Sequence, residues 1–179
     1  MVTTRSTKEG RLLSDAEKAM ARSIFGSAID LDAVHLYRRK WWLFHPRNVT
    51  MAPRGNIHFH PRGSSYCDCF AQNSLALQGH LIHELVHVWQ HQQGVNLLLR
   101  RHPFCRYDYS FKPGKRFTDY GIEQQAEIVR HVFLMRRGQA VPGKPSLSVL
   151  ESILPFGRDP QLRPSRRATS ACDSRRDRR

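Results

Sequence analysis

The chain has 179 residues, of which 40% are hydrophobic and 9% aromatic, so it can bury one hydrophobic core but not the cores of two full domains. Its 29 lysines and arginines against 15 acidic residues give a formal charge of +14, which predicts an acidic partner such as nucleic acid, an anionic membrane surface or an acidic protein. No segment reaches the roughly 18 consecutive apolar residues of a membrane span, and the N-terminal residues lack the apolar core of a signal peptide. We therefore expect a soluble protein, synthesised in the cytoplasm, with no membrane span.

The first predicted element is a helix near the N-terminus. Ser14 stands three residues before Glu17, which is the spacing of a capping box, and apolar residues continue with helical spacing to Gly26. Residues 1–12, which precede this helix, are predicted to be a flexible N-terminus. After the helix, residues 30–42 predict a turn followed by a short strand.

The next segment predicts a strand and contains a possible set of metal ligands. In residues 55–61, apolar side chains alternate with His58 and His60 before a proline, which is typical of a strand with one face in water. These two histidines could form a closed zinc site with Cys67 and Cys69. However, a single residue between the cysteines is shorter than the usual spacing in such sites, so buried free cysteines are the simpler interpretation. We expect no disulfide framework from the four cysteines, which are Cys67, Cys69, Cys105 and Cys172.

Residues 79–94 predict an apolar helix that carries several histidines. At 100° per residue, one face of this helix holds four histidines and a glutamate, and the opposite face is apolar. The histidine face consists of His80, His83, Glu84, His87 and His91. It could be a solvent-exposed polar face, a set of hydrogen-bonded core histidines, or a chance pattern. His-Glu-x-x-His arises by chance in roughly 2% of chains of this composition, and it is a known zinc-helix motif.

The motif assigns a distinct chemical role to each of its polar residues. His83 and His87 lie one turn apart and can bind one Zn²⁺, while Glu84 projects toward the open coordination position. The longer pattern with a glycine and a third histidine fails, because Gln90 and Gln93 occupy those positions. A third ligand from the same helix is therefore not expected.

A later helix offers the missing carboxylate. Residues 106–111 alternate like a strand, and residues 122–137 have the spacing of a long helix that is closed by a glycine. Glu123 and Glu127 share one face of this helix, one turn apart. One of the two can bind zinc, and the other can orient a histidine ligand.

These motifs resemble those of known protein families. The Glu-x-x-x-Glu pattern resembles the Glu-x-x-x-Asp partner motif of gluzincin metallopeptidases, although Glu127 stands where that pattern usually has Asp. The segments ARSIFGSAIDLDAV, GNIHFHP, HELVHVWQHQ and EQQAEIV are similar to small bacterial Vgr-related proteins. They are more distantly similar to the metallopeptidase-like core domain of contractile injection systems. The resemblance covers roughly residues 11–137.

The resemblance implies a fold and a set of roles. We expect an α+β, zincin-like single domain over residues 13–156, with the His-Glu-x-x-His helix, a second glutamate-bearing helix and a small sheet that lines the cleft. The implied cofactor is Zn²⁺, with Glu123 as the third ligand and Glu127 holding the ring N–H of a histidine ligand. The implied partners are a peptide or protein substrate and a protein of the secretion apparatus, and export by a contractile secretion system remains open.

If the site is catalytic, the expected reaction is hydrolysis of a peptide or amide bond. Zn²⁺ lowers the pKa of water toward about 7, and Glu84 takes the proton and passes it to the leaving amine. Hydrogen-bond donors for the developing oxyanion are sought among Tyr107, Tyr109, Tyr120 and His131. Tyr120 and His131 rank first because they flank Glu123 in sequence, although simple packing is the stronger alternative for each.

The last 23 residues, 157–179, contain eight arginines and three aspartates and almost no apolar residues, which predicts a basic disordered tail. The tail could bind nucleic acid, but no nucleic-acid-binding motif supports this, and a solvated basic surface is the better interpretation of the other basic segments. Three functional classes remain. They are a zinc metallopeptidase, a non-catalytic zincin-like docking component of an injection apparatus, and a basic nucleic-acid-binding protein with a structural zinc.

Overall fold

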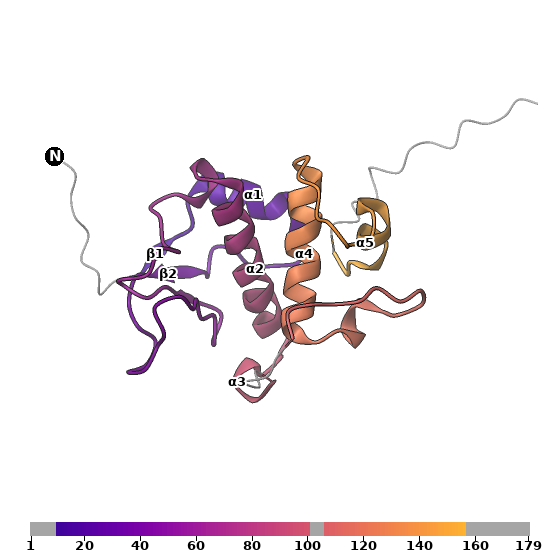
Figure 1. Ribbon diagram of the computed structural model, residues 1–179. Helices are drawn as coiled ribbons and strands as arrows, with labels where there is room; N and C mark the ends of the chain where they lie inside the picture. The colour runs from indigo at the N-terminus through magenta and orange to yellow at the C-terminus, as the bar shows by residue number, and fades with distance from the viewer. Residues whose placement is uncertain (1–9, 101–105, 157–179) are drawn as a thin grey trace, which may run out of the picture.

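The computed structural model describes residues 10–100 and 106–156 (Figure 1). Over these residues, five α-helices, two short 3-10 helices and a three-stranded sheet form one small α+β domain, which confirms the predicted fold class. In chain order the elements are β1 (Arg11–Leu12), α1 (Asp15–Phe25), β2 (His35–Tyr37), β3 (Ile57–His58), η1 (Phe70–Gln72), α2 (Leu75–Gln92), α3 (Leu97–Arg100), η2 (Phe117–Asp119), α4 (Ile122–Arg136) and α5 (Leu147–Ile153).

Helix α1 begins and ends as its sequence predicts. The Ser14 hydroxyl accepts a hydrogen bond from the backbone N–H of Glu17, and the Glu17 carboxylate accepts one from the backbone N–H of Ser14, so the capping box is confirmed. The helix stops at Gly26, which has a φ of 58° that a side chain would strain. Its inner face is buried in the common core through Met20, Ile24 and other residues.

The sheet is small and mixed. Strand β1 pairs antiparallel with β2, and β2 pairs parallel with β3, with Leu36 opposite Ile57. The strands predicted within residues 30–42 and 55–61 therefore exist, in shorter form. Strand β1 corrects the expectation that residues 1–12 are a flexible N-terminus, because Arg11 and Leu12 belong to the sheet. Residues 1–9 and the predicted tail at 157–179 lie outside the described residues.

A buried ion pair fastens β1 to the domain. The guanidinium of Arg11 donates two hydrogen bonds of 2.8 Å to the carboxylate of Glu17, and a third of 3.3 Å to the carbonyl of Cys67. The same carboxylate accepts the backbone N–H of Phe70 at 2.8 Å. Burial alone would raise the pKa of Glu17, but these hydrogen bonds hold it below its ordinary value. The ion pair thus joins the N-terminal strand, α1 and the segment before α2.

Residues 106–111 do not form the strand that their alternating pattern predicts. The segment has no regular secondary structure. Instead, Tyr109 is buried in the core, and its hydroxyl donates a hydrogen bond of 2.8 Å to Nδ1 of His131 on α4. The alternation therefore reflects side chains that pack against a helix and not pairing with another strand.

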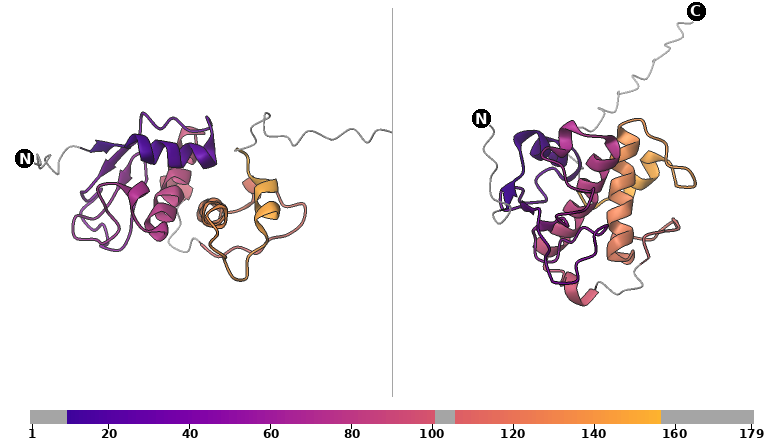
Figure 2. Two further views of the ribbon diagram at one scale, coloured as in Figure 1. Left: turned by 90° about the horizontal axis from the view of Figure 1, so that it is seen from above. Right: turned by 60° about the vertical axis from the view of Figure 1, so that its left-hand side comes forward.

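Helices α2 and α4 lie side by side in the middle of the molecule (Figures 1 and 2). Helix α1 and the strands lie on the α2 side of this pair, and α5 packs against α4 (Figure 2). Gly79 on α2 permits α4 to approach closely, since a Cβ at this position would lie 3.1 Å from a methyl carbon of Leu134 and 3.5 Å from the side chain of Arg130. No helix in residues 10–100 and 106–156 is both long and apolar enough to cross a membrane.

Candidate metal centre

The histidine face of α2 is covered by α4. The sequence predicts one apolar and one polar face, but His83, Glu84 and His87 are as buried as the leucines on the opposite side, with 7%, 4% and 3% of their surfaces exposed. The expectation of a solvent-exposed polar face therefore does not apply to these three residues. Buried ionisable groups need partners, because their desolvation is costly. Helix α4 supplies these partners.

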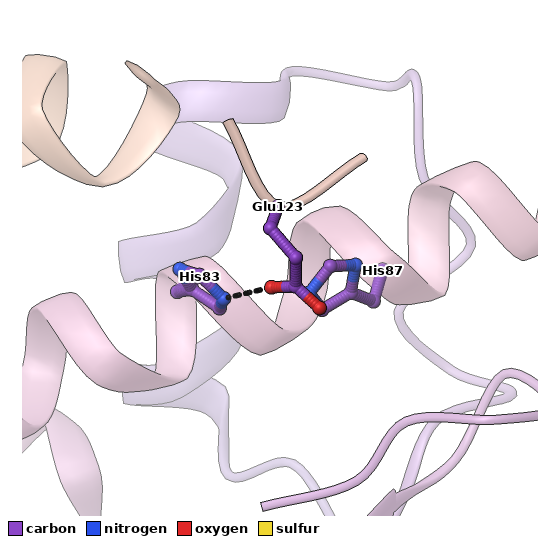
Figure 3. Close-up of side chains that lie close together, drawn as sticks. All are labelled: His83, His87 and Glu123. Atoms are coloured by element: carbon purple, nitrogen blue, oxygen red, sulfur yellow. Dashed lines mark hydrogen bonds and ion pairs between the residues drawn. The ribbon is translucent and has the colours of Figure 1, made fainter. Parts of the chain in front are cut away.

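Three side chains from the two helices converge on one point (Figure 3). Nε2 of His83 lies 3.2 Å from Oε2 of Glu123, and Nε2 of His87 lies 3.1 Å from the same oxygen. All three ligand atoms lie within 4.8 Å of one another. The motif on α2 and the carboxylate on α4, which are 36 residues apart in sequence, are thus brought together as the sequence predicts.

The donor set fits a zinc ion. Atoms bound to zinc at about 2.0–2.1 Å in a tetrahedron lie roughly 3.3 Å apart, close to the two separations found here. Two imidazoles and one carboxylate are also the protein ligands of known catalytic zinc sites that keep one open position. Within the described part of the chain, no second group of three potential ligands converges in this way.

The alternative zinc site does not assemble. The ring of His58 stacks on Tyr37, with centroids 4.8 Å apart, and the ring of His60 makes an edge contact with His45. The Sγ of Cys69 lies 3.7 Å from the hydroxyl of Ser14. These histidines and cysteines are therefore engaged separately. Cys67 and Cys69 are free, as expected, but they are half-buried and not buried.

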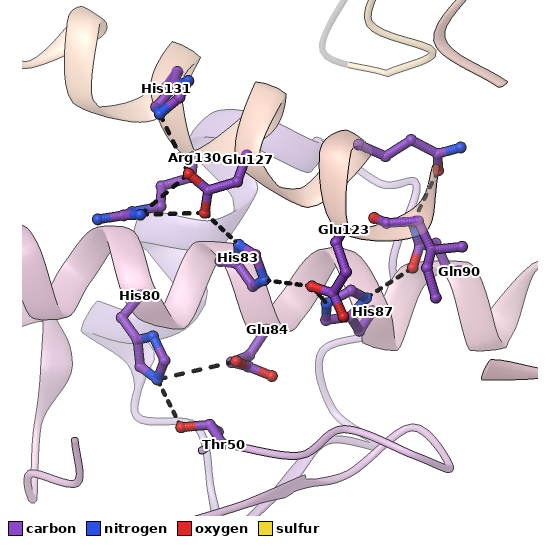
Figure 4. Close-up of polar contacts among 12 residues, drawn as sticks. Thr50, His80, His83, Glu84, His87, Gln90, Glu123, Glu127, Arg130 and His131 are labelled. Carbon is purple, nitrogen blue, oxygen red and sulfur yellow. Dashed lines mark hydrogen bonds and ion pairs between the residues drawn. The ribbon is translucent and has the colours of Figure 1, made fainter. Parts of the chain in front are cut away.

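Each of the two histidines is oriented through its other ring nitrogen (Figure 4). Nδ1 of His83 donates to Oε1 of Glu127 at 2.9 Å, and Nδ1 of His87 donates to Oε1 of Gln90 at 2.9 Å. These contacts leave Nε2 of both rings facing Glu123. Buttressing of this kind fixes the tautomer and the ring orientation of histidines that bind metals.

Gln90 is a site residue that the sequence analysis missed. Its amide nitrogen donates to the carbonyl of Ile122 at 3.1 Å and to Oε1 of Gln125 at 2.9 Å, so it also fastens the start of α4 beside Glu123. The signal was present in the sequence, since Gln90 follows His87 by three positions and lies on the same helix face.

Glu127 is the centre of a second group of contacts behind His83. Arg130 donates to both of its oxygens at 3.1 and 3.2 Å, and Nε2 of His131 lies 3.3 Å from Oε2. Burial alone would raise the pKa of Glu127, but hydrogen bonds from His131 and His83 and the charge of Arg130 hold it well below its usual range. The carboxylate is therefore ionised and fixed in place.

The carboxylates around His83 favour its charged form. Burial alone would lower the pKa of His83, but hydrogen bonds to Glu123 and Glu127 and the nearby charge of Glu84 raise it to about 9. The side chains around His83 therefore favour a positive charge at this point. A bound metal cation would satisfy the same preference.

Glu84 is a buried carboxylate on α2 beside the cluster (Figure 4). Its Oε1 lies 4.0 Å from Nε2 of His80, which in turn is 2.7 Å from the hydroxyl of Thr50. Its Oε2 is buried and has no hydrogen-bond partner among the described residues (Figure 4). A buried carboxylate oxygen without a partner is costly, and it is suited to a site where the carboxylate meets a bound molecule.

The two predicted oxyanion donors lie elsewhere. The hydroxyl of Tyr120 is buried without a hydrogen-bond partner among the described residues, and its ring packs edge-on against Tyr109 at 6.2 Å. His131 lies behind Glu127. Neither lines the two pockets that flank His83, His87 and Glu123. Tyr107 is better placed, because it is half exposed, lines the same pocket as Glu84, and stacks on His83 with centroids 6.1 Å apart.

Two pockets of different character adjoin the cluster. The polar pocket is lined by His83, Glu84 and Tyr107 among other residues, and it has an empty volume of about 630 Å³, part of it open to solvent. The apolar pocket is lined by His87 and Glu123 together with hydrophobic side chains, and its empty volume is about 360 Å³, part of it likewise open to solvent. The buried cluster thus borders two pockets that open to solvent, and His91 lines neither of them.

Comparison with known proteins places this site in a family context. The chain is 38% identical over 154 residues to the type VI secretion system spike protein VgrG2b of Pseudomonas aeruginosa, and the match covers 80% of this chain but 15% of that protein. Its fold is similar to the solved structure of the effector domain of P. aeruginosa VgrG2b, with a TM-score of 0.65 and 35% identity over 76% of this chain and 80% of that chain. No protein-family profile matches the chain.

Proposed function

The chain belongs to the family of the VgrG2b effector domain. We propose that it is a zinc-dependent metallopeptidase that hydrolyses peptide or amide bonds. The predicted relation to Vgr-related bacterial proteins is confirmed. The observation that carries the proposal is the convergence of His83, His87 and Glu123 next to the buried carboxylate of Glu84, beside an accessible pocket.

Each polar residue of the site has a role in this proposal. His83, His87 and Glu123 hold the metal, while Glu127 and Gln90 keep the two imidazoles in the required orientation. Zinc, when bound, supplies Lewis acidity, which polarises a carbonyl and makes a water molecule easier to deprotonate.

The remaining steps belong to the side chains that line the polar pocket. Glu84 accepts a proton from the attacking water and returns it to the leaving amine. The hydroxyl of Tyr107, at the rim of the same pocket, donates a hydrogen bond to the carbonyl oxygen as negative charge develops on it. Tyr107 replaces Tyr120 and His131 in this role, because it lines the pocket and they do not.

The test separates metal binding from chemistry. In Glu84→Gln the side chain keeps its size but loses its basicity, so zinc content should be unchanged while hydrolysis of an unfolded protein substrate falls by about 100-fold or more. Glu151→Gln, on the surface of α5, is the control and should match the parent. Equal hydrolysis by the parent and Glu84→Gln would remove the proposed mechanism.

We also propose that the protein acts with a type VI secretion system. The support is its relation to a part of the spike protein VgrG2b. Because the chain spans only 15% of that protein's length, its delivery and its apparatus partner are inferred from the relative. Recovery of the protein from culture medium should require an intact secretion apparatus in the bacterium that encodes it. Equal recovery without the apparatus would contradict this assignment.

A further inference from the structure

The apolar pocket lies directly against the metal ligands. One wall is formed by His87 and Glu123, whose side chains contact each other at 3.1 Å. The remaining walls come from four separate parts of the chain, namely the segment around residue 41, the segment before β3, helix α3 and helix α4. Their hydrophobic members include Trp41, Met51, Pro53, Leu97, Leu98 and Ile122.

The two pockets divide the metal ligands between them. His83 and Glu84 line the polar pocket, whereas His87 and Glu123 line the apolar pocket. A molecule that reacts at the cluster therefore has a polar environment on one side and an apolar environment on the other. In an extended peptide, successive side chains point in opposite directions. The residues on either side of a bond held at the cluster would thus meet different pockets.

We propose that the apolar pocket binds one large apolar side chain, of the Leu, Met or Phe class, from a residue that flanks the bond to be cleaved. The proposal rests on the proposed peptidase function and specifies its substrate. A substrate side chain is the favoured occupant because anything in this pocket lies against His87 and Glu123. The pocket lining contains no lysine or arginine, so an acidic or other strongly polar side chain that extends into it away from the metal would lose its hydration without compensation.

The exposure of Leu98 is consistent with a pocket that is open to solvent until a substrate side chain binds. Leu97 and Ile122 are buried, with 5% and 7% of their surfaces exposed, whereas Leu98 at the same pocket is 47% exposed. Contact with an apolar side chain would remove part of this surface from water. Full burial of a Leu or Phe side chain typically corresponds to a gain in affinity of about 10- to 100-fold over a residue without that side chain.

The first experiment reads the preference from cleavage products. The zinc-loaded protein is incubated with a diverse peptide mixture, and the residues that flank each cleaved bond are identified by mass spectrometry. We expect Leu, Met and Phe to be enriched at one flanking position, with kcat/KM lower by about 10-fold or more for a matched peptide with Ala there. Cleavage without such enrichment would overturn the pocket assignment but leave the peptidase proposal intact.

Two neighbouring leucines provide a matched pair of variants. Leu98→Lys places a charge at the pocket, whereas Leu99→Lys places the same charge on a residue that is 82% exposed and does not line it. Both leucines are on the surface of α3, so both variants should fold, as circular dichroism will check. Leu98→Lys should reduce the apolar preference by about 10-fold and Leu99→Lys should preserve it. An equal effect of both would contradict the assignment.

A binding measurement keeps the inference testable if no hydrolysis is found. Glu84→Gln is titrated with N-acetyl-leucinamide and with N-acetyl-aspartamide while methyl signals of Leu97, Leu98 and Ile122 are followed by NMR. The leucine probe should shift these signals, and the aspartate probe should not. If the parent shows no hydrolysis but the leucine probe shifts these signals in Glu84→Gln, the pocket assignment stands and the peptidase proposal is removed. Absence of shifts would overturn the pocket proposal. It would also be overturned if light scattering showed a dimer of the parent that Leu98→Lys converts to monomers, because the occupant of the pocket would then be a second copy of the chain.

Discussion

The two glutamates of α4 should have unequal effects on zinc binding. Glu123→Ala removes one of three donors and should empty the site. Glu127→Ala keeps all three donors but removes the acceptor of the 2.9 Å hydrogen bond from Nδ1 of His83, while His87 keeps its contact with Gln90. Carboxylates in this supporting position typically contribute about 10- to 100-fold to metal affinity, or about 1.4 to 2.8 kcal/mol. Glu127→Ala should therefore weaken zinc binding without abolishing it.

Competition with a chelator of known zinc affinity measures this difference. Circular dichroism and the unfolding midpoint of the metal-free variants will show whether they fold. Glu151→Ala serves as the control, because Glu151 pairs with Arg136 at the surface and not with the cluster. A larger loss for Glu127→Ala than for Glu123→Ala would exchange the two roles. If neither variant changed the zinc affinity, the third ligand would lie elsewhere and the assigned site would be wrong.

Three further predictions concern single features of the structure. Gln90→Ala should weaken zinc binding by about 10-fold in the same competition assay, because His87 loses its orienting acceptor; no change would show that Gln90 only fastens α4. Glu17→Gln should destabilise the fold by about 3 kcal/mol in urea unfolding at pH 7. Since the folded-state pKa of Glu17 lies below its ordinary value of 4.5, this difference should be full above that pH and shrink as the pH falls below it. A constant difference down to pH 3 would contradict the role of the ion pair. Truncation after Phe156, the last described residue and part of the core, should leave the melting temperature within a few degrees of the parent, and a large loss would show that the tail contributes to the fold.

The sequence predicted those parts of the site that depend on local spacing. The capping box at Ser14 and the helical register that aligns His83 with His87 follow from helix periodicity. The choice of Glu123 as their partner came from the resemblance to gluzincin metallopeptidases. Residues 3 or 4 apart on a helix share a face whatever the rest of the chain does. The chemistry of zinc then restricts which side chains must meet.

The features that sequence reasoning missed depend on contacts between distant segments. Strand β1 forms because Arg11 reaches Glu17 and the carbonyl of Cys67, which no local pattern reveals. Closeness to Glu123 in sequence favoured Tyr120 over Tyr107, yet Tyr107 lines the polar pocket and Tyr120 is buried against Tyr109. The apolar pocket brings together residues near 41, 51 and 97, and only the folded chain places them beside His87.

The central claim is that His83, His87 and Glu123 bind zinc. It is tested most directly by the zinc content of the purified full-length protein, measured by mass spectrometry of the metal, for the parent and for the double variant His83→Ala, His87→Ala. The account predicts about one zinc ion per chain in the parent and essentially none in the double variant, because two of its three protein ligands are lost. Zinc retained by the double variant, or a parent that binds no zinc when supplied with it, would contradict the account.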